Sequence, residues 1–429
     1  MKRFWVAAYS FGVIPLFWIV VRGIGLVNRK TRRGIAGRKT LFADLERQIA
    51  LLGPGPRVWF HSSSMGEFEQ AKPVIEELKR RQPGTCVVVS FFSPSGYEHS
   101  RKYRLADVIT YLPFDTRRNA RRFLDLIRPD AAVMVRYDIW PNHIWELHRR
   151  GIPTLIANAT MRQHTRRRLP VARGFHRSVY NEIDDILTVA PSDVEAFRNF
   201  SIDHPTLQAI GDTRYDQVAG RSAEARKRHI IPQAITAGKR VIVIGSSWPE
   251  DEEVVMPACL RLQAESGNVL VIVVPHEPTE EHIEGLERDI AGRASSIRFS
   301  GLNEYAGESI VIVDSVGILL LLYAHAHIAY VGGSFKQGIH NVLEAAAFGI
   351  PVLFGPRHRN SHEPIMLVEC GGGFVVENTD ELHRTLAHLL EDDGARSASG
   401  ERAARFVESH TGATTRFLKH LEQRLSSRP

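Results

Sequence analysis

The strongest constraint on the fold of this chain is a repeated alternation of short apolar segments with segments of helical length. The apolar segments of the first half are rich in β-branched residues, and an amphipathic stretch follows most of them. Short strands that alternate with helices form parallel sheets covered by helices on both faces. The sequence therefore predicts an α/β domain with strands at 58–62, 86–92, 108–112, 131–135, 154–158, 186–190 and 206–211.

The same pattern begins again in the second half of the chain. A length of 429 residues exceeds what one core usually supports, so two domains are expected. Two consecutive Rossmann-like domains place the active site in a cleft between them, at the carboxyl ends of the strands. The further strands are predicted at 241–245, 269–274, 309–314, 328–333, 351–355 and 373–377.

The segments outside these strands set the expected boundaries. Residues 217–238 are polar with one central apolar pair, which indicates an interdomain linker, and residues 379–427 are typical of a helical tail. We therefore expect four parts. They are an anchor with a basic flank at 1–39, an N-terminal Rossmann-like domain at 40–216, the linker, and a C-terminal Rossmann-like domain with a helical tail at 239–429.

The N-terminus carries an uncharged apolar run at residues 4–21. As a helix these 18 residues extend about 27 Å, close to the roughly 30 Å hydrocarbon thickness of a bilayer. Seven Lys/Arg follow between residues 22 and 39, against two before the run, so the positive-inside rule keeps the rest of the chain in the cytoplasm. We expect a single N-terminal membrane anchor, either a span, kinked at Gly12 and Pro15, or a re-entrant segment. The alternative is a cleaved signal peptide, although no A-x-A-like site follows the run.

The basic residues of the chain are concentrated at this end. Net charge is +7, but residues 1–39 hold nine Lys/Arg and no acid, and the remainder has 46 basic against 48 acidic residues. This distribution indicates contact with anionic membrane lipids and no nucleic-acid groove. The three cysteines are far apart and lack any CxxC spacing, which argues against a disulfide framework or a structural zinc site.

A first candidate loop, SSSMGE at 62–67, joins a predicted strand to a helix. Gly66 lets the backbone turn tightly, and Glu67 falls in the first turn of the helix, where the helix dipole favours a carboxylate. The motif is compatible with catalysis by Glu67, with Ser64 and Gly66 beside the substrate. It is equally compatible with a carboxylate that only caps the helix.

A second candidate is the glycine-rich segment YVGGSFKQGIHNVLEAAAFGIPVLFGP at 330–356. Backbone N–H groups at a helix start bind anions, and glycines allow a phosphate to approach closely. Glu344, one turn into the helix, is placed to accept from ribose hydroxyls, and His340 is expected to be partly exposed. The alternative is a glycine-rich connection with a satisfied histidine. The predicted contacts here are Gly333, Ser334, Lys336, Gly338, His340, Asn341, Val342, Leu343 and Glu344.

Two further strand ends carry polar residues. GSSWPEDEE at 245–253 places Gly245, Ser246 and Ser247 before a helix whose acidic first turn is explained by capping. Pro275 and His276 end the next predicted strand and point toward the same cleft. In RYDIWPNHIWE at 136–146, Asp138 ends a strand, while the two tryptophans are expected to pack.

A basic stretch at 161–180 contains six Arg and no acid. A charge run usually forms a solvated face. Here the lack of compensating carboxylates favours an anionic surface or substrate, because Arg forks bind phosphate bidentately. We expect an acceptor patch of Arg162, Arg166, Arg167 and Arg168. No metal-binding constellation such as HExxH stands out.

Taken together, these motifs resemble the 3-deoxy-D-manno-octulosonic acid (Kdo) transferases of lipopolysaccharide synthesis. The resemblance extends from about residue 33 to beyond residue 356, and its parts keep the family's order. The matching segments are SSSMGE, SFFSPSGYE, YLPFD, DIWPN, IPTLIANATM, GDTRYD, VDSVGILLLLY and GGSFKQGIHNVLEAAAFGIPVLFGP.

The resemblance implies a GT-B fold, in which two Rossmann-like domains face each other across a cleft. It implies an inverting transfer of Kdo from CMP-Kdo to a phosphorylated lipid A precursor on the cytoplasmic side of the inner membrane, with no metal and no cofactor. By position, Glu67 matches the general base, and Arg214 stands where the family usually has Lys and would stabilise the leaving phosphate. The segments matched to CMP contacts are Pro275-His276, Val316-Gly317-Ile318 and Asn341 to Glu344.

The sequence departs from the family pattern at several positions. The usual ETELWPN is RYDIWPN, so one acid is replaced by Arg136 and the other is shortened to Asp138, the third predicted catalytic residue. His276 and Ile318 stand where the family has Arg and Glu, and GGHN is GIHN. Two alternatives stay open. One is a GT-B transferase that uses a UDP- or GDP-sugar on a lipid acceptor; the other is a catalytically silent membrane-bound nucleotide-binding or scaffold protein.

Overall fold

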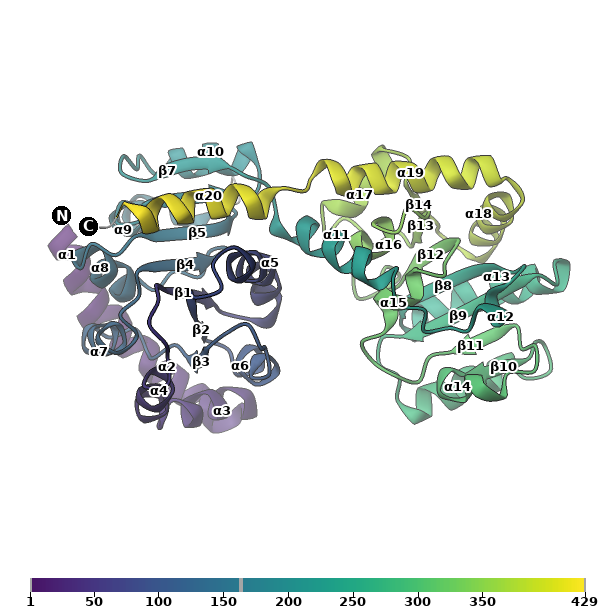
Figure 1. Cartoon of the computed structure of the whole chain (residues 1–429), viewed down its shortest axis with the longest axis horizontal. Coiled ribbons are helices and arrows are strands. Elements are labelled where there is room, and N and C mark those ends of the chain that lie inside the picture. Colours follow the sequence, from purple (N-terminus) through teal and green to yellow (C-terminus); the bar gives the residue numbers. More distant parts are fainter. Residues whose placement is uncertain (1, 162–164, 428–429) are drawn as a thin grey trace. The chain divides into compact units, whose positions relative to one another are not determined.

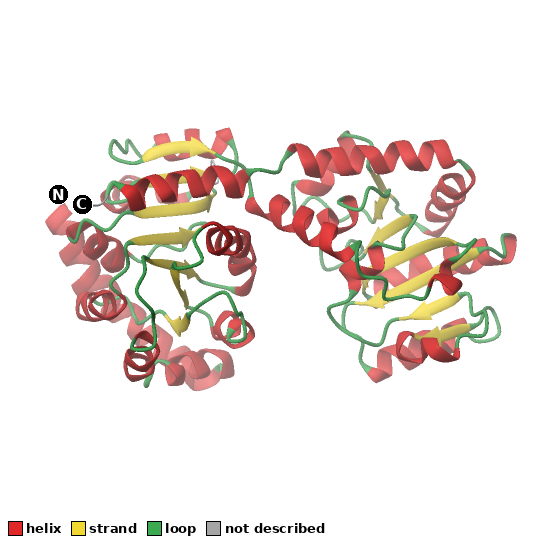
Figure 2. Ribbon diagram, viewed as in Figure 1, coloured by secondary structure: helices red, strands yellow, loops and turns green. Residues whose placement is uncertain are grey.

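A computed structural model describes residues 2–161 and 165–427 of the chain. The chain divides into two compact units, each built around its own parallel sheet (Figures 1 and 2). The first unit comprises Met1–Gln217 together with Thr411–Pro429, and the second comprises Val218–His410.

The sheet of the first unit has seven strands in the order β3-β2-β1-β4-β5-β6-β7, and every pair is parallel. This is the doubly wound Rossmann order, which reverses direction between β1 and β4. The strands are β1 Arg57–Ser62, β2 Cys86–Phe91, β3 Val108–Tyr111, β4 Ala131–Val135, β5 Thr154–Ala159, β6 Asp185–Thr188 and β7 Thr206–Ala209. All of them overlap the predicted strands.

Helices cover both faces of this sheet, as Figure 2 shows. Successive residues of a strand point to opposite faces, so β1 sends Val58 and Phe60 into one core and Trp59 into the other. The helices are α4 Leu41–Ile49, α5 Met65–Arg81, α6 Pro94–Ser100, α7 Arg117–Ile127, α8 Pro141–Arg149, α9 Pro170–Tyr180, α10 Pro191–Arg198 and α20 Ala413–Ser426, with a 3₁₀ turn at Arg166–Arg168.

The division of the chain differs from the expected boundaries at two places. Helix α11, Thr213–Ala225, runs without a break through the start of the predicted linker, a stretch rich in helix-forming Ala, Glu and Arg. The last helix of the predicted tail, α20, packs in the first unit, where Phe417, Leu418 and Leu421 are fully buried. The carboxylate of Asp216 fixes the start of α20 by accepting from the backbone N–H groups of Gly412 and Thr414.

The N-terminal apolar run forms one continuous helix, Lys2–Val27, that is long and apolar enough to cross a membrane by length and composition. It consists of α1 Lys2–Ala8, a π-helical turn Tyr9–Val13 and α2 Ile14–Val27, and is followed by α3 Arg29–Gly37. The π turn directly precedes Pro15, which cannot donate the backbone hydrogen bond of a regular α-helix.

The second unit repeats the architecture with the strand order β10-β11-β9-β8-β12-β13-β14, again all parallel. Six strands were predicted; the short, half-buried edge strand β10 was not. The strands are β8 Arg240–Ser247, β9 Val269–Pro275, β10 Ser296–Arg298, β11 Ile310–Ile312, β12 Ile328–Val331, β13 Val352–Phe354 and β14 Gly373–Val375.

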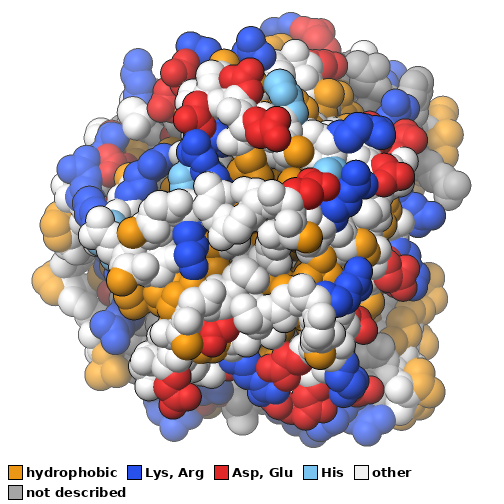
Figure 3. Space-filling model, turned by 90° about the vertical axis from the view of Figure 1, so that its right-hand side faces the viewer, with side chains coloured by type: hydrophobic (Ala, Val, Ile, Leu, Met, Phe, Trp, Pro, Cys, Tyr) orange, Lys and Arg blue, Asp and Glu red, His pale blue; other side chains and the backbone are white. Residues whose placement is uncertain are grey.

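Helices flank the sheet of the second unit, and one apolar core there includes buried residues of β8, β9, β11 and β12. They are α12 Gln233–Thr236, α13 Pro249–Glu265, α14 Glu280–Ile290, α15 Leu319–Tyr323, α16 Val342–Ala346, α17 Glu363–Glu369, α18 Thr379–Glu391 and α19 Asp393–Ser409, with a 3₁₀ helix at Phe299–Glu304. The face of this unit displayed in Figure 3 mixes acidic and basic side chains without a large patch of either sign.

Candidate active site

Glu67 lies at the carboxyl edge of the first sheet, where β1 ends and α5 begins. The Ser64 hydroxyl accepts from the Glu67 N–H at 3.4 Å, and Oε2 of Glu67 accepts from the N–H groups of Ser63 at 2.6 Å and Ser64 at 3.2 Å. This reciprocal capping box shows that Glu67 caps α5. Oε1, however, accepts no hydrogen bond from any residue that the structure describes, so this oxygen is available to a ligand.

The surroundings of Glu67 favour its protonated form. The side chain is almost completely buried, and burial together with the negative charge of Asp138 raises the pKa of Glu67 above its ordinary value. The backbone hydrogen bonds from Ser63 and Ser64, and the nearby His61, act in the opposite direction but are weaker. A carboxylate with a raised pKa is a better general base near neutral pH than an ordinary glutamate.

Asp138 belongs to a hydrogen-bonded group that includes a residue absent from the sequence predictions. Nε2 of His61 lies 2.8 Å from Oδ2 of Asp138, and Nδ1 of the same fully buried ring lies 2.8 Å from the Ser90 hydroxyl. The Trp140 indole lies 3.3 Å from the same carboxylate oxygen. Although burial opposes it, hydrogen bonds from His61, Ser63 and Trp140 lower the pKa of Asp138. Asp138 therefore keeps its charge beside Glu67.

His61 could have been suspected from the sequence, because it is a lone ionisable residue in the otherwise apolar strand VWFHS. What the sequence does not reveal are its partners, which lie 29 and 77 residues away along the chain. Trp140 was expected to pack, and it does pack against Phe92, with ring centroids 4.4 Å apart. Its indole nitrogen also makes the polar contact to Asp138.

Arg214, at the start of α11, is held by a buried neighbour in the first unit. Its Nε and Nη2 atoms lie 2.9 and 2.8 Å from Oδ2 of Asp212. The preceding Thr213 is fixed by Gln70 and by Asn158, whose φ of 52° is strained for a non-glycine residue. Arg136, just after β4, has a φ of 63°. Strained backbone of this kind concentrates at functional sites, and here it marks the same sheet edge.

The predicted acceptor patch is only partly described. Arg162 and the side chain of Arg166 lie outside the described residues. Arg167 donates to the Tyr180 hydroxyl at 3.2 Å, and Arg168 to the Ala196 carbonyl at 3.5 Å. Both of these guanidinium groups therefore contact the protein itself.

The glycine-rich loop of the second unit follows β12 at the carboxyl edge of that sheet. A Cβ atom on Gly332 would lie 2.3 Å from the Ser246 carbonyl oxygen, and one on Gly333, with φ of 88°, would lie 2.5 Å from that of Gly338. No side chain fits at either glycine. Gly245, at the end of β8, is equally restricted, because its Cβ would lie 2.1 Å from the Tyr323 hydroxyl.

Asp251 is the buried residue that organises this loop. Its carboxylate accepts from the N–H of Gly333 at 2.7 Å, the Tyr330 hydroxyl at 3.0 Å and the N–H of Trp248 at 3.0 Å. The acidic start of α13 was interpreted as helix capping, and Asp251 does cap that helix. Its bond to Gly333 in addition joins α13 to the loop, which the sequence does not reveal.

Several of the predicted ligand contacts also have partners within the unit. The buried Ser334 hydroxyl accepts from Gly355 N–H at 2.6 Å, and that of Ser247 donates to Glu252 at 2.6 Å. The side chains of Val342 and Leu343 are in the core, so only their backbone can face a ligand. Lys336 forms an ion pair with Glu250, and Glu344 lies 3.8 Å from Arg221.

The remaining predicted residues lie on loops at the carboxyl edge. Asn341 caps α16 by accepting from Leu343 N–H at 3.2 Å, and Pro275 ends β9. Val316 is 78% exposed on the loop after β11, where Gly317 has φ of 85° and Ile318 precedes α15. Ser246 has φ of 53°, and Gly338 has φ of 106°.

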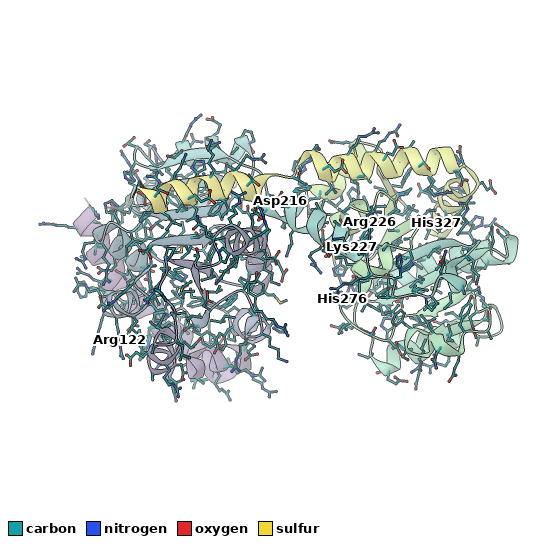
Figure 4. The ribbon with its side chains drawn as sticks, in the orientation of Figure 1. Arg122, Asp216, Arg226, Lys227, His276 and His327 are labelled. Atoms are coloured by element: carbon teal, nitrogen blue, oxygen red, sulfur yellow. The ribbon has the colours of Figure 1, made fainter. Side chains whose placement is uncertain are left out.

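His276, which Figure 4 labels after β9, and His340 form a stacked pair with ring centroids 4.4 Å apart. Trp248 stacks on His276 at 4.6 Å and donates from its indole nitrogen to Nε2 of His340 at 2.9 Å. Burial, followed by the charge of His276, lowers the pKa of His340. The two histidines were predicted as separate contacts, and the structure brings them together beside the glycine-rich loop. Trp248 was not predicted.

Among residues 2–161 and 165–427, no group of three His, Cys, Asp or Glu side chains is arranged to hold a metal ion. The ionisable groups at the carboxyl edge of the first sheet include Glu67, which is buried, and Asp138, which is partly buried. Glu67 can accept a proton from a hydroxyl group. In the second unit, His276 and His340 lie beside the glycine-rich loop.

Two Rossmann-like units, each with an all-parallel sheet, define the GT-B class of fold. Solved structures of that architecture resemble the chain at low identity. A putative UDP-N-acetylglucosamine 2-epimerase from Listeria monocytogenes has a TM-score of 0.60 at 13% identity, covering 88% of this chain and 98% of its own. MurG from Acinetobacter baumannii has a TM-score of 0.51 at 13% identity, covering 86% of this chain and 100% of its own.

Sequence comparison relates the chain to one group of transferases. Residues 30–217 match the family described as 3-deoxy-D-manno-octulosonic-acid transferase (kdotransferase). The 3-deoxy-D-manno-octulosonic acid transferase of Haemophilus influenzae is 26% identical over 435 residues, covering 98% of each chain. That of Chlamydophila psittaci is 27% identical over 413 residues, covering 93% of each. The match places a Kdo transferase domain in the first half of the chain, and the chain is similar to named Kdo transferases over nearly its whole length.

Proposed function

We propose that this protein is an inverting glycosyltransferase that moves Kdo from CMP-Kdo to a phosphorylated lipid A precursor. The observation that carries the proposal is the state of Glu67. In a chain similar to Kdo transferases, a buried carboxylate with a raised pKa keeps one oxygen without a hydrogen-bond partner among the described residues.

In the proposed reaction, Oε1 of Glu67 accepts the proton of the acceptor hydroxyl as the hydroxyl oxygen attacks the anomeric carbon of Kdo. The bond from that carbon to the phosphate oxygen of CMP breaks, and CMP departs with the electron pair. A single displacement of this kind inverts the anomeric configuration and requires one general base on the acceptor side. Arg214 is the proposed cation for the developing phosphate charge.

The donor is assigned to the second unit. Gly332 and Gly333 let the loop pack directly on the backbone of Ser246 and Gly338, and the stacked rings of His276 and His340 lie beside it. The other proposed contacts are Gly245, Ser246, Pro275, Val316 to Ile318, Gly338 and Asn341. Ser64 and Gly66, at the start of α5, are proposed to border the acceptor.

The proposed location is the cytoplasmic side of the inner membrane, with the N-terminal helix as the attachment. Anionic lipids would interact with the basic residues that flank this helix, each contributing about 1 kcal/mol near the surface. A membrane-attached enzyme meets a lipid acceptor in two dimensions, which fits an acceptor whose acyl chains remain in the leaflet.

The donor assignment is tested by thermal unfolding of the purified full-length protein with different nucleotides. CMP is expected to raise the unfolding temperature, because a ligand that binds only the folded state stabilises it by mass action. UDP and GDP at the same concentration are expected to have much smaller effects. A larger stabilisation by UDP or GDP would contradict the assignment of CMP-Kdo as donor.

The pH dependence tests the pairing of Glu67 with Asp138. Activity requires ionised Glu67, so it is expected to fall as the pH drops through a pKa that lies above the ordinary value for glutamate. Asp138→Asn removes the negative neighbour, lowers the pKa of Glu67, and should move this acid limb of kcat/KM to lower pH. An unchanged or upward-shifted limb would show that Asp138 does not act on Glu67.

A further inference from the structure

The N-terminal helix Lys2–Val27 belongs to the first unit and contacts it at several points from Lys2 to Phe17 (Figure 1). Its inner stripe is formed by side chains three to five residues apart, which are buried or half-buried. The helix therefore runs along the surface of the first unit from Lys2 to Phe17, and its last turns pack on α3. The stripe consists of Trp5, Tyr9, Ile14, Phe17, Val21 and Gly25.

The stripe packs mainly on aromatic rings of the first unit, and the surface that these rings form is called the seat. Tyr9 packs on Phe175 and Trp145, with ring centroids 5.5 and 5.8 Å apart. Phe17, two turns further on, lies 6.2 Å from Trp140. Gly174 of α9 leaves room for the ring of Trp5, since a Cβ there would lie 3.0 Å from it.

Polar contacts fix the same seat. The Tyr9 hydroxyl donates to Asp115 at 2.9 Å, and both residues are buried. The Ser10 hydroxyl lies 3.0 Å from Oδ1 of Asn142, and Lys2 pairs with Glu182. At the other end, Arg32 of α3 donates to the carbonyls of Gly25 at 3.1 Å and Leu26 at 2.6 Å. Removing the helix would expose Asp115 and the rings around it.

The outer face of the helix is apolar and exposed, from Phe11 at 76% and Leu16 at 63% to Val27 at 87%. Basic residues border it. A cavity of about 670 Å³ beside the first turns of the helix is lined by Lys2, Arg3, Arg117, Arg121 and Arg149, together with Glu146. Helix α7 adds Arg118 and Arg122, and the latter is labelled in Figure 4. An apolar helix face bordered by cations complements the anionic surface of a bilayer.

We propose that Lys2–Val27 does not cross the membrane but lies in the plane of the cytoplasmic leaflet, as a fixed part of the first unit. Its outer face enters the acyl region, and the arginines of α7 contact anionic headgroups. The inference rests on the proposed membrane attachment, but not on the proposed chemistry. A crossing helix would have to leave its seat or carry Arg117, Arg121 and Glu146 into hydrocarbon, where charged groups are strongly disfavoured.

Disulfide trapping in native membranes tests the seat. The pair Ser10→Cys with Asn142→Cys replaces two side chains in contact, in a Cys370→Ser background where the remaining Cys86 and Cys259 are buried. Oxidation of inner-membrane vesicles is expected to cross-link most of the membrane-bound protein. The control pair, Phe11→Cys with Asn142→Cys, has one cysteine on the outer face and should stay reduced. A reduced Ser10–Asn142 pair, in protein that pellets with the membrane, would overturn the proposal.

Labelling of spheroplasts with a membrane-impermeant maleimide locates the two ends of the helix. In the same background, Arg3→Cys and Arg29→Cys should both react only after the membrane is permeabilised. Reaction of Arg3→Cys alone in intact spheroplasts means that the helix crosses, which contradicts the inference. Reaction of both in intact spheroplasts, or protein absent from the membrane fraction, contradicts instead the proposed cytoplasmic attachment on which the inference rests.

The headgroup contacts are tested with vesicles of phosphatidylglycerol and phosphatidylcholine. The full-length double variant Arg117→Glu with Arg118→Glu should bind phosphatidylglycerol vesicles at least about tenfold more weakly than the wild type. Binding to pure phosphatidylcholine should change little. Arg198→Glu, which reverses an exposed charge on α10, is the matched control and should bind both like the wild type. Equal binding of the double variant and the control would show that α7 does not contact the membrane surface.

Discussion

Glu67→Gln is expected to reduce the rate of Kdo transfer by about 10²- to 10⁴-fold, the usual contribution of a general base. The amide cannot accept the hydroxyl proton, but its oxygen can still accept from the N–H groups of Ser63 and Ser64. The fold should survive, with a loss of about 0.3–1 kcal/mol from the weaker interaction with the helix dipole. Binding of CMP, which is assigned to the other unit, should not change.

The matched control is Glu69→Gln, two residues further along α5. Glu69 forms an ion pair with Lys72 and accepts from Gln217 at 2.8 Å, so the same chemical change there removes only surface contacts. Steady-state kinetics of both variants, with CMP titrations, separate the outcomes. If Glu67→Gln retains full activity, or if Glu69→Gln loses as much, Glu67 is not the base.

Gly332→Ala should be the most damaging single change on the donor side. The new Cβ would lie 2.3 Å from the carbonyl oxygen of Ser246 and 2.8 Å from Cα of Ser247, and both are backbone atoms that cannot rotate away. Overpacking of this kind typically costs about 1–3 kcal/mol. Because the displaced segments both belong to the proposed donor site, we expect CMP binding to be lost along with this stability.

Gly285→Ala, in α14 of the same unit, is the control for adding a methyl group. The nearest atom to its Cβ would be Nη2 of Arg288 at 3.9 Å, and alanine is favoured over glycine inside a helix by about 1 kcal/mol. Thermal unfolding and calorimetric titration with CMP should show a neutral or slightly more stable variant with normal binding. A Gly332→Ala variant with wild-type CMP affinity would contradict the donor site.

The fold was largely predictable, because its sheets consist of apolar runs that only a buried parallel strand explains. β4, AAVMV, is an example, since all five of its residues are buried. The three-residue β10, SIR, was missed because it is short, polar and only half-buried. The helices of the tail were predicted, but not that α20 packs in the first unit. That packing depends on Asp216 and on a core whose other residues lie hundreds of positions earlier.

In the candidate site, too, features that are local in sequence were predictable and contacts between distant residues were not. Glu67 could be identified as a candidate from its own loop, because the capping motif SSSMGE is local in sequence. The contact between His61 and Asp138 could not be predicted, since the two residues are 77 positions apart and meet only across neighbouring strands. The contact between Trp248 and His340 could not be predicted either, because these residues are 92 positions apart. Ser247 and Ser334 were predicted as ligand contacts from their position after strands, but burial and internal partners engage both hydroxyls.

The proposed transfer is tested most directly by incubating the purified protein with CMP-Kdo and a tetraacylated lipid A precursor and measuring product masses. The account predicts that the precursor gains the mass of one or more Kdo residues in a reaction that also releases CMP. An unmodified precursor in the presence of folded, CMP-binding protein would contradict it, as would a product formed only when a UDP- or GDP-sugar replaces CMP-Kdo.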